Sequence, residues 1–137
     1  MTWLVDTNVL SELRKGARAD RGMVRWWQGV AEHELFLSVL ALGAIRKEAD
    51  SVRGRDPAFA GALAAWLRGL SEHFAGRVLP VDAAVAAIWG RLSAARALPV
   101  IDGLMAATAL LHDLTLVTRN VRHVSGLGVR VLDPSTG

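Results

Sequence analysis

The sequence predicts an α/β protein with three layers, in which helices cover both faces of a central parallel sheet of about five strands. Short apolar runs alternate along the chain with longer segments of helical periodicity, which is the pattern of repeated strand–helix–strand units. The runs are mostly apolar, as expected for strands buried on both faces. A length of 137 residues corresponds to one domain spanning 1–137.

The predicted strands are the short apolar runs. The first ends at Asp6, and the second ends at Ser38. Their composition and their bounding turn residues favour strands over short buried helices. We expect strands at residues 3–5, 35–38, 78–81, 115–118 and 129–132.

The predicted helices follow from 3.6-residue spacing and from their end signals. Gly16 ends the first helix, Pro57 suits the first position of the fourth, and Asp82 is a natural N-cap for the fifth. The sixth begins at Asp102, where apolar residues recur at three- and four-residue spacing. We expect helices at residues 7–14, 23–31, 39–52, 57–74, 83–96 and 102–112, with a loop at 17–22.

Composition excludes several classes of protein. The chain is 52% hydrophobic with a mean hydropathy of +0.30, which is too apolar for intrinsic disorder. We expect no membrane span and no signal peptide, because the longest apolar stretches and the N-terminal segment are interrupted by charges. The absence of cysteine excludes disulfides, thiolate zinc sites and cysteine nucleophiles, and it fits a cytoplasmic protein.

The cations are almost all arginine. Lys15 and Lys47 are the two lysines among 16 cations, and the formal net charge is +3. Arginine grips phosphate with a planar fork, so this bias favours an anionic partner such as nucleic acid. The same bias is also what a GC-rich genome gives to any protein.

Polar residues gather where the predicted parallel strands end. Asp6, Ser38 and Asn120 follow three of the strands, and Asp102 at its helix start faces the same edge. Both aspartates have a second interpretation as helix caps. Two carboxylates meeting at this edge would suit Mg²⁺, which prefers oxygen ligands and keeps several waters. Metal-assisted phosphodiester hydrolysis is then available to the site.

Other chemistries lack their patterns. The serines have no G-x-S-x-G setting, the histidines have no H-E-x-x-H spacing, and neither common glycine-rich phosphate loop is present.

Four segments distributed along the chain form a set of motifs. The segments are Leu4-Val5-Asp6-Thr7-Asn8-Val9-Leu10-Ser11-Glu12-Leu13, 37–47, Pro99-Val100-Ile101-Asp102-Gly103-Leu104-Met105-Ala106-Ala107-Thr108-Ala109 and Leu116-Val117-Thr118-Arg119-Asn120-Val121-Arg122-His123. Together they resemble the motifs of PIN-domain nucleases, and more narrowly the VapC toxins of the FitB-like branch. The resemblance covers essentially the whole chain in the family's order.

The resemblance implies a PIN-like fold and a metal-dependent endoribonuclease that acts as the toxin of a type II toxin–antitoxin pair. It implies Mg²⁺ or Mn²⁺ held by Asp6 and Asp102, with Thr7 and Asn8 supporting the first acid and Asn120 at the rim. Structured RNA, such as tRNA or rRNA, is the implied substrate. A VapB-type antitoxin is the implied partner, with a homodimer and larger complexes with the antitoxin as the implied assemblies.

The sequence departs from the family pattern at two places. Ala44 stands where the second motif normally carries glutamate, and the stretch from Asn120 to His123 has no acid. Glu48 lies one turn beyond Ala44, but we interpret it as a solvated surface residue. Asp113 lies about 16 Å from Asp102 along its helix and cannot substitute. We interpret Ala44 as a substitution made on purpose to silence a toxic nuclease. The alternative is that the acid was lost naturally.

Three classes of function therefore remain. The first is a ribonuclease toxin weakened at Ala44, and the second is a non-catalytic module of the same fold that binds RNA or a partner. Ala44 favours the second class over the first. The third is an unrelated α/β enzyme such as a phosphotransferase, which Asn8 disfavours because a phosphoaspartyl motif needs aspartate there.

Overall fold

The computed structural model describes residues 1–135 and confirms the predicted α/β architecture. Five parallel strands form one sheet in the order β3-β2-β1-β4-β5, so that β1 lies at the centre. Its neighbours β2 and β4 pair with it at Trp3↔Leu35 and Trp3↔Thr115. The strands are β1 Trp3–Val5, β2 Leu35–Ser38, β3 Val78–Leu79, β4 Thr115–Val117 and β5 Val131–Leu132.

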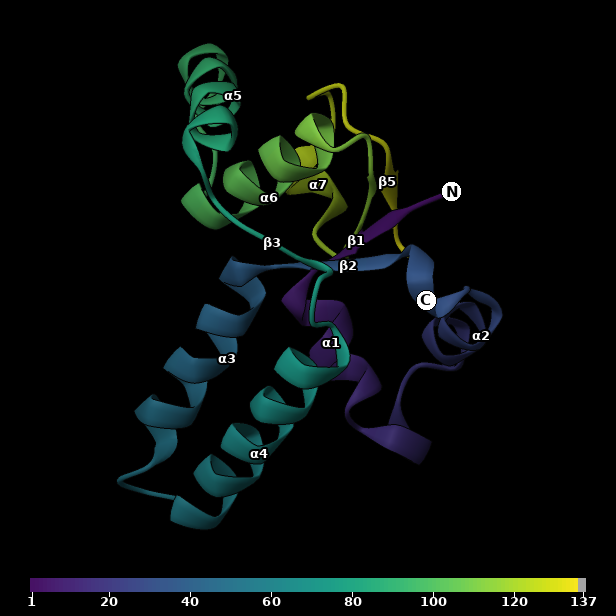
Figure 1. The fold of residues 1–137 in the computed structure, drawn as a ribbon, viewed down its shortest axis with the longest axis vertical. Helices are drawn as coiled ribbons and strands as arrows, with labels where there is room; N and C mark the ends of the chain where they lie inside the picture. The colour runs from purple at the N-terminus through teal and green to yellow at the C-terminus, as the bar shows by residue number, and fades with distance from the viewer. Residues whose placement is uncertain (136–137) are drawn as a thin grey trace.

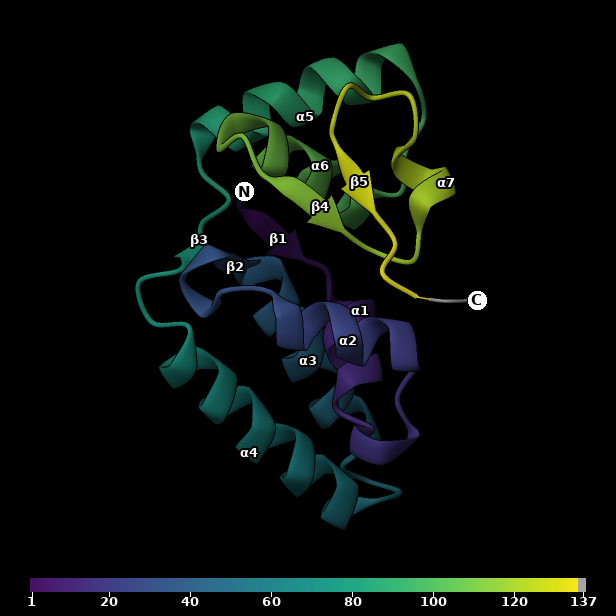
Figure 2. The same cartoon turned by 90° about the vertical axis from the view of Figure 1, so that its right-hand side faces the viewer.

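Helices cover the sheet in two groups, which gives the three predicted layers. Figures 1 and 2 show α1 to α4 on one side of the sheet and α5 to α7 on the other. The helices are α1 Thr7–Leu13, α2 Arg21–Gly29, α3 Val39–Val52, α4 Pro57–His73, α5 Ala83–Ala95, α6 Val100–Leu111 and α7 Val121–Val124, with short 3-10 helices at Gly16–Arg18 and Glu32–Glu34.

The alternation of side chains along each strand divides the core into two clusters. Val5 and Val117 point into the cluster beneath α1 to α4, while Leu4 and Leu116 point into the cluster beneath α6. All four are buried, as a parallel sheet covered on both faces requires. A third small cluster lies between α3 and α4, away from the sheet.

Several predicted boundaries are corrected by the structure. Helix α6 begins at Val100 with Pro99 at its N-cap, so Asp102 lies in the first turn and does not cap the helix. Helix α2 begins at Arg21 because the Asp20 side chain caps it, accepting a hydrogen bond from the Met23 N–H. The predicted loop at 17–22 contains a 3-10 turn, and the third and fifth strands are each two residues long.

Within the described part of the chain, no helix combines the length and the apolar character that a membrane span needs.

Candidate functional site

The candidate site lies beyond the carboxyl ends of β1 and β4. These two strands are neighbours in the sheet, but the chain leaves β1 towards β2 and reaches β4 only after crossing back from β3 at one edge. Such a reversal of strand order opens a crevice between the loops that follow the two strands, where ligands of α/β proteins bind. Asp6 directly follows β1, and Thr118 directly follows β4.

Asp6 is both a helix cap and the buried acid of this crevice. It is 8% exposed, and its Oδ1 accepts a hydrogen bond of 2.7 Å from the Thr7 N–H at the start of α1. Its Oδ2 accepts a hydrogen bond of 2.8 Å from the Thr118 hydroxyl. Burial raises the pKa of Asp6 above its usual value, the two hydrogen bonds oppose that shift, and the negative charge of Asp102 adds to it. The two aspartates therefore act on each other electrostatically.

Thr118 connects the residues of the two loops. Besides donating to Asp6, its buried Oγ1 accepts from the Asn8 side-chain amide at 3.2 Å and from the Asn120 backbone N–H at 3.0 Å. The Asn8 carbonyl oxygen in turn accepts from the Arg119 N–H at 3.3 Å. Asn8 thus ties the first turn of α1 to the loop after β4, which is a supporting position for Asp6.

Asp102 presents its carboxylate from the first turn of α6, with a side chain that is 14% exposed. The half-exposed His123 ring lies beside it, with Nδ1 donating to Oδ2 at 2.7 Å. The Arg96 guanidinium fixes the backbone around this ring, because it donates to the carbonyl oxygens of His123 and Ser125. The sequence reasoning missed this pairing of His123 with the second acid.

Two other predicted residues of the strand ends differ in their roles. Asn120 is exposed at the N-cap of α7. Its side chain makes no cap hydrogen bond, so the side-chain amide is open to solvent. Ser38 is fully buried, and its hydroxyl oxygen accepts from the Leu40 N–H to cap α3. Ser38 is therefore a capping residue of the fold, because this local bond uses the hydroxyl that was expected at the ligand edge.

Ala44 lies on the exposed face of α3 and lines a cavity of about 310 Å³ together with Ile101, the residue before Asp102. Most of the cavity wall is apolar, and Lys47 stands one turn further along the same helix. A longer side chain at position 44 would have open space beside the start of α6. Glu48 is exposed and lines a different cavity from the one beside Ala44.

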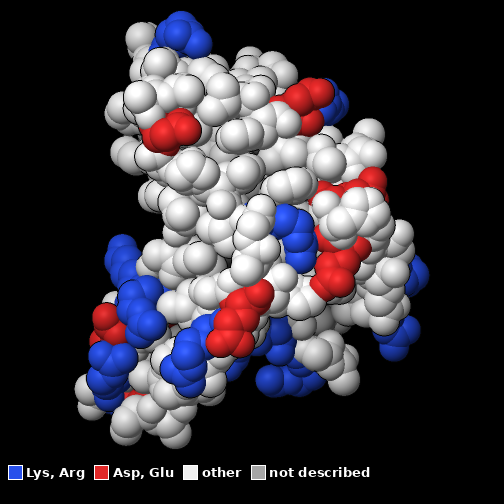
Figure 3. All heavy atoms as spheres, in the orientation of Figure 1, with Lys and Arg blue, Asp and Glu red and all other residues white. Residues whose placement is uncertain are grey.

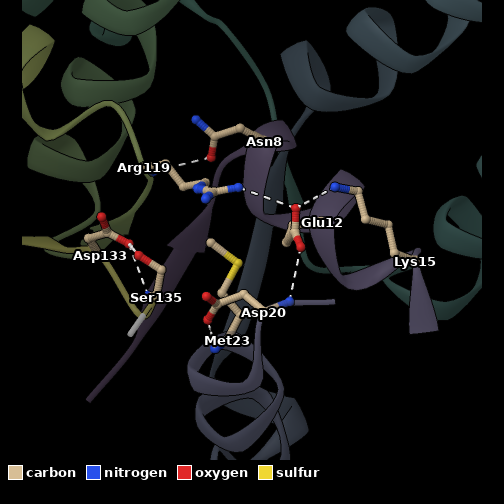
Figure 4. Close-up of polar contacts among 8 residues, drawn as sticks. All are labelled: Asn8, Glu12, Lys15, Asp20, Met23, Arg119, Asp133 and Ser135. Carbon is tan, nitrogen blue, oxygen red and sulfur yellow. Dashed lines mark hydrogen bonds and ion pairs between the residues drawn. The ribbon is translucent and has the colours of Figure 1, made fainter. Parts of the chain in front are cut away.

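A second buried carboxylate, which the sequence reasoning missed, lies next to the site. Glu12 is 9% exposed and accepts from Lys15 Nζ at 2.9 Å, from the Asp20 N–H at 2.9 Å and from Arg119 Nη1 at 3.2 Å (Figure 4). The hydrogen bond from Lys15 and that from the Asp20 backbone hold the pKa of Glu12 below its usual value. The sequence did contain a signal for a buried Glu12. This residue follows Val9 by one helical turn, so its charge lies on the apolar face of α1.

The donor set of the crevice fits one hard divalent cation. Asp6 and Asp102 supply carboxylate oxygens, and a cation bound to both would compensate the negative charge that burial and, more weakly, Asp102 disfavour at Asp6. Among the described residues, no three histidine, aspartate or glutamate side chains converge as a metal cluster. Mg²⁺ is compatible with this sparse set, because it often binds through one or two carboxylates and keeps its remaining waters.

Comparison with known proteins gives the class of protein to which this fold and site correspond. The PIN domain family matches residues 3–125, and the chain belongs to that family.

Individual relatives span nearly the whole chain. The sequence is 29% identical to Toxin FitB of Neisseria gonorrhoeae and 29% identical to VapC ribonuclease Y4jK of Sinorhizobium fredii, with 96% of each chain covered in both cases. The crystal structure of FitAcB from Neisseria gonorrhoeae has a chain that matches with a TM-score of 0.85 at 28% identity, over 97% of this chain and 98% of that one. A structure of FitAB bound to an IR36 DNA fragment matches with a TM-score of 0.86 at 27% identity, over 97% and 95% of the two chains.

Proposed function

We propose that this chain is the toxin of a type II toxin–antitoxin pair, a metal-dependent endoribonuclease whose activity is weakened at Ala44. The observation that carries the proposal is the pair of Asp6 and Asp102 at the strand-order reversal, where burial and, as a smaller contribution, the negative charge of Asp102 raise the pKa of Asp6. Membership of the PIN family and the relatives named as a toxin and a ribonuclease support the nuclease assignment.

The residues of the crevice would have different roles in RNA cleavage. Asp6 and Asp102 would hold Mg²⁺ or Mn²⁺, which when bound polarises a phosphodiester and lowers the pKa of an attacking water. The Thr118 hydroxyl donates directly to the Asp6 carboxylate and limits its rotation, while Asn8 supports Asp6 indirectly by donating to that hydroxyl oxygen. Asn120 at the rim can donate to a substrate phosphate from its side-chain amide.

Ala44 removes one oxygen donor from this arrangement. A glutamate at position 44, which the resemblance to the family implies for the second motif, would project from α3 towards the start of α6, across the cavity shared with Ile101. Its loss lowers the negative charge that attracts the cation, and it loosens the placement of the reacting groups. A misplacement of ~1 Å costs ~100-fold in rate.

A VapB-type antitoxin is the proposed partner, with homodimers as the proposed assembly and the cytoplasm as the proposed location. The pair of Asp6, which is buried, and Asp102, which is partly exposed, favours a partner that inserts an arginine or lysine side chain, because a cationic group compensates negative charge as a metal ion would.

The test of the proposed function is cleavage of total RNA with Mn²⁺ or Mg²⁺, with a chelator as control. Ala44→Glu should cleave at least ~100-fold faster than the unaltered chain, and adding Asp102→Asn to it should abolish cleavage. Asp113→Asn is the matched control, because Asp113 is an exposed acid at the far end of α6 that pairs with Arg130. Equal cleavage by the Ala44→Glu protein with and without Asp102→Asn would refute the proposed site.

The second candidate function is a non-catalytic PIN module that binds RNA or a partner, and the methyl of Ala44 is the observation that favours it. In that case the Ala44→Glu protein would bind RNA but would not cleave it with either metal ion.

A further inference from the structure

A second cavity, of about 280 Å³, lies between the C-terminal end of α1, the following 3-10 turn and the α3–α4 hairpin. Its wall combines positive charge with aromatic rings. Arg14, Lys15 and Arg18 supply the cations, Phe59 and Trp66 supply the rings, and Glu48 is the acid in the wall. The cavity is separate from the Asp6–Asp102 crevice, but α1 connects the two.

Arg14 is held in place by the rings. Its guanidinium carbon lies 5.3 Å from the centre of the Phe59 ring and 5.5 Å from that of Trp66. Contacts with aromatic faces orient a guanidinium without neutralising it, which leaves its planar fork of N–H donors available. Arg14 therefore has a restricted orientation and a retained charge.

The cations of this cavity differ in how far they are compensated. Lys15 pairs with Glu12, whereas across residues 1–135 neither Arg14 nor Arg18 lies within ion-pair distance of a carboxylate. Glu48 shares the cavity but forms no ion pair with them in the same range. Two uncompensated arginines beside one acid favour an anionic ligand, and the guanidinium fork matches the geometry of a phosphate.

The position relative to the carboxylate pair indicates what carries that phosphate. Asp6 caps the start of α1 and Arg14 caps its end, so the two lie about 12 Å apart along the helix. Further lysines and arginines gather on the surface over α3 and α4 (Figure 3). Helix α3 and its C-cap carry the exposed Arg46, Lys47 and Arg53, of which Arg46 and Arg53 share an ion pair with Asp50. A strand with regularly repeated phosphates can contact these cations while one of its linkages lies in the crevice, which a single carboxylate side chain cannot do.

We propose that the cavity around Arg14 and Arg18 binds a backbone phosphate of the RNA substrate, a few nucleotides from the linkage held at Asp6 and Asp102. This inference rests on the proposed ribonuclease function. It adds a binding site remote from the reacting bond, which fixes the register of the strand without reading its sequence.

The test is binding of a fluorescein-labelled single-stranded RNA of mixed sequence to the chain in excess chelator, where cleavage does not interfere. Affinities are measured by fluorescence anisotropy over a series of salt concentrations. Arg14→Gln should weaken binding about five- to tenfold and lower the slope of log affinity against log salt by ~0.7, the value for one lost contact to a single-stranded phosphate. Arg14→Lys should keep the slope, because it keeps the charge.

Arg91→Gln is the matched control, since it removes one exposed arginine from α5 on the opposite layer and should change neither quantity. Thermal denaturation verifies that the variants are folded. If Arg14→Gln does not fold, the same binding measurements are made with Arg18→Gln. Equal affinity losses for Arg14→Gln and Arg91→Gln would overturn the inference while leaving RNA binding intact. Failure of the unaltered chain to bind RNA would instead refute the proposed function. If poly-glutamate displaces the RNA equally well and shows the same dependence on Arg14, the ligand is an acidic peptide and the RNA assignment is wrong.

Discussion

At the scale of single residues, Asp6 combines a structural with a chemical role. Its carboxylate caps α1 and accepts from Thr118, but burial and the charge of Asp102 still hold its pKa above the usual value. Between the unfolded and the raised folded pKa, the folded chain binds more protons at this group than the unfolded chain does. The contribution of Asp6 to stability therefore decreases as the pH rises through that window.

The first prediction follows from this sign. A divalent cation compensates the ionised pair, so Mn²⁺ should raise the melting temperature of the chain more at about pH 7 than at about pH 4.5, where the protonated acid competes with the ion. Thermal denaturation followed by circular dichroism, with and without Mn²⁺ at each pH, measures the difference. An equal Mn²⁺ effect at both pH values would contradict the assignment of Asp6 as a ligand.

The second prediction concerns Thr118, whose hydroxyl joins Asp6, Asn8 and the loop after β4. Thr118→Val keeps the shape of the side chain but removes these hydrogen bonds, and it should lower the free energy of unfolding by about 1–3 kcal/mol. The matched control is Thr115→Val in β4, because that hydroxyl makes only a long contact of 3.4 Å to Arg130. Chemical denaturation of both variants measures their free energies of unfolding. Equal losses for Thr118→Val and Thr115→Val would show that the Thr118 hydroxyl has no special linking role.

The sequence predicted the acids better than their partners. Asp6, Asp102 and Asn120 were expected near one edge because each follows a strand or opens a helix, and that is a local signal. The bond from Thr118 to Asp6 joins residues 112 positions apart, and the bond from Arg119 to Glu12 joins residues 107 positions apart. Periodicity does not carry such pairings, since they depend on which strands become neighbours in the folded sheet.

At the scale of elements, the differences between prediction and structure lie at the ends of strands and helices, where more than one residue could mark the boundary. Asp102 looked like an N-cap, but Pro99 ends the preceding segment and places the start of α6 at Val100. The aspartate thereby moves into the first turn, where its carboxylate bonds to His123 and its charge contributes to the raised pKa of Asp6. The predicted third and fifth strands were too long because ladder pairing with β2 and β4 involves only two residues of each.

The third prediction concerns the α3–α4 hairpin, which has a small core separate from the two clusters at the sheet. Leu63 is 1% exposed in that core and also lines the arginine-rich cavity. Leu63→Ala should cost about 2–5 kcal/mol of unfolding free energy and should speed hydrogen exchange in α3 and α4 more than in β1 and β4. Leu110→Ala on α6, a partly buried position outside the hairpin, provides the comparison. A uniform increase in exchange across the chain would contradict a separate hairpin unit.

At the scale of the whole molecule, the strand order and the charge distribution place the chemistry. The reversal between β1 and β4 brings the two loops with Asp6 and Thr118 side by side, and the helices of both layers contribute to the crevice through α1 and α6. The fold class, the family and this edge were accessible from the sequence, because apolar runs and four ordered motifs span nearly all of it. The ion pairs of Glu12 and the cavity around Arg14 and Arg18 could not be predicted from the sequence, since they depend on how α1, α3 and α4 pack together.

The central claim is that Asp6 and Asp102 form a divalent cation site that lacks a third acid at position 44. Calorimetric titration of Mn²⁺ into the unaltered chain, Ala44→Glu and Ala44→Gln measures it most directly. We expect Ala44→Glu to bind Mn²⁺ at least about tenfold more tightly, or ~1.4 kcal/mol, because a third carboxylate joins the pair. Ala44→Gln, which has the same size without the charge, should bind like the unaltered chain. Equal affinities for all three proteins would contradict the claim.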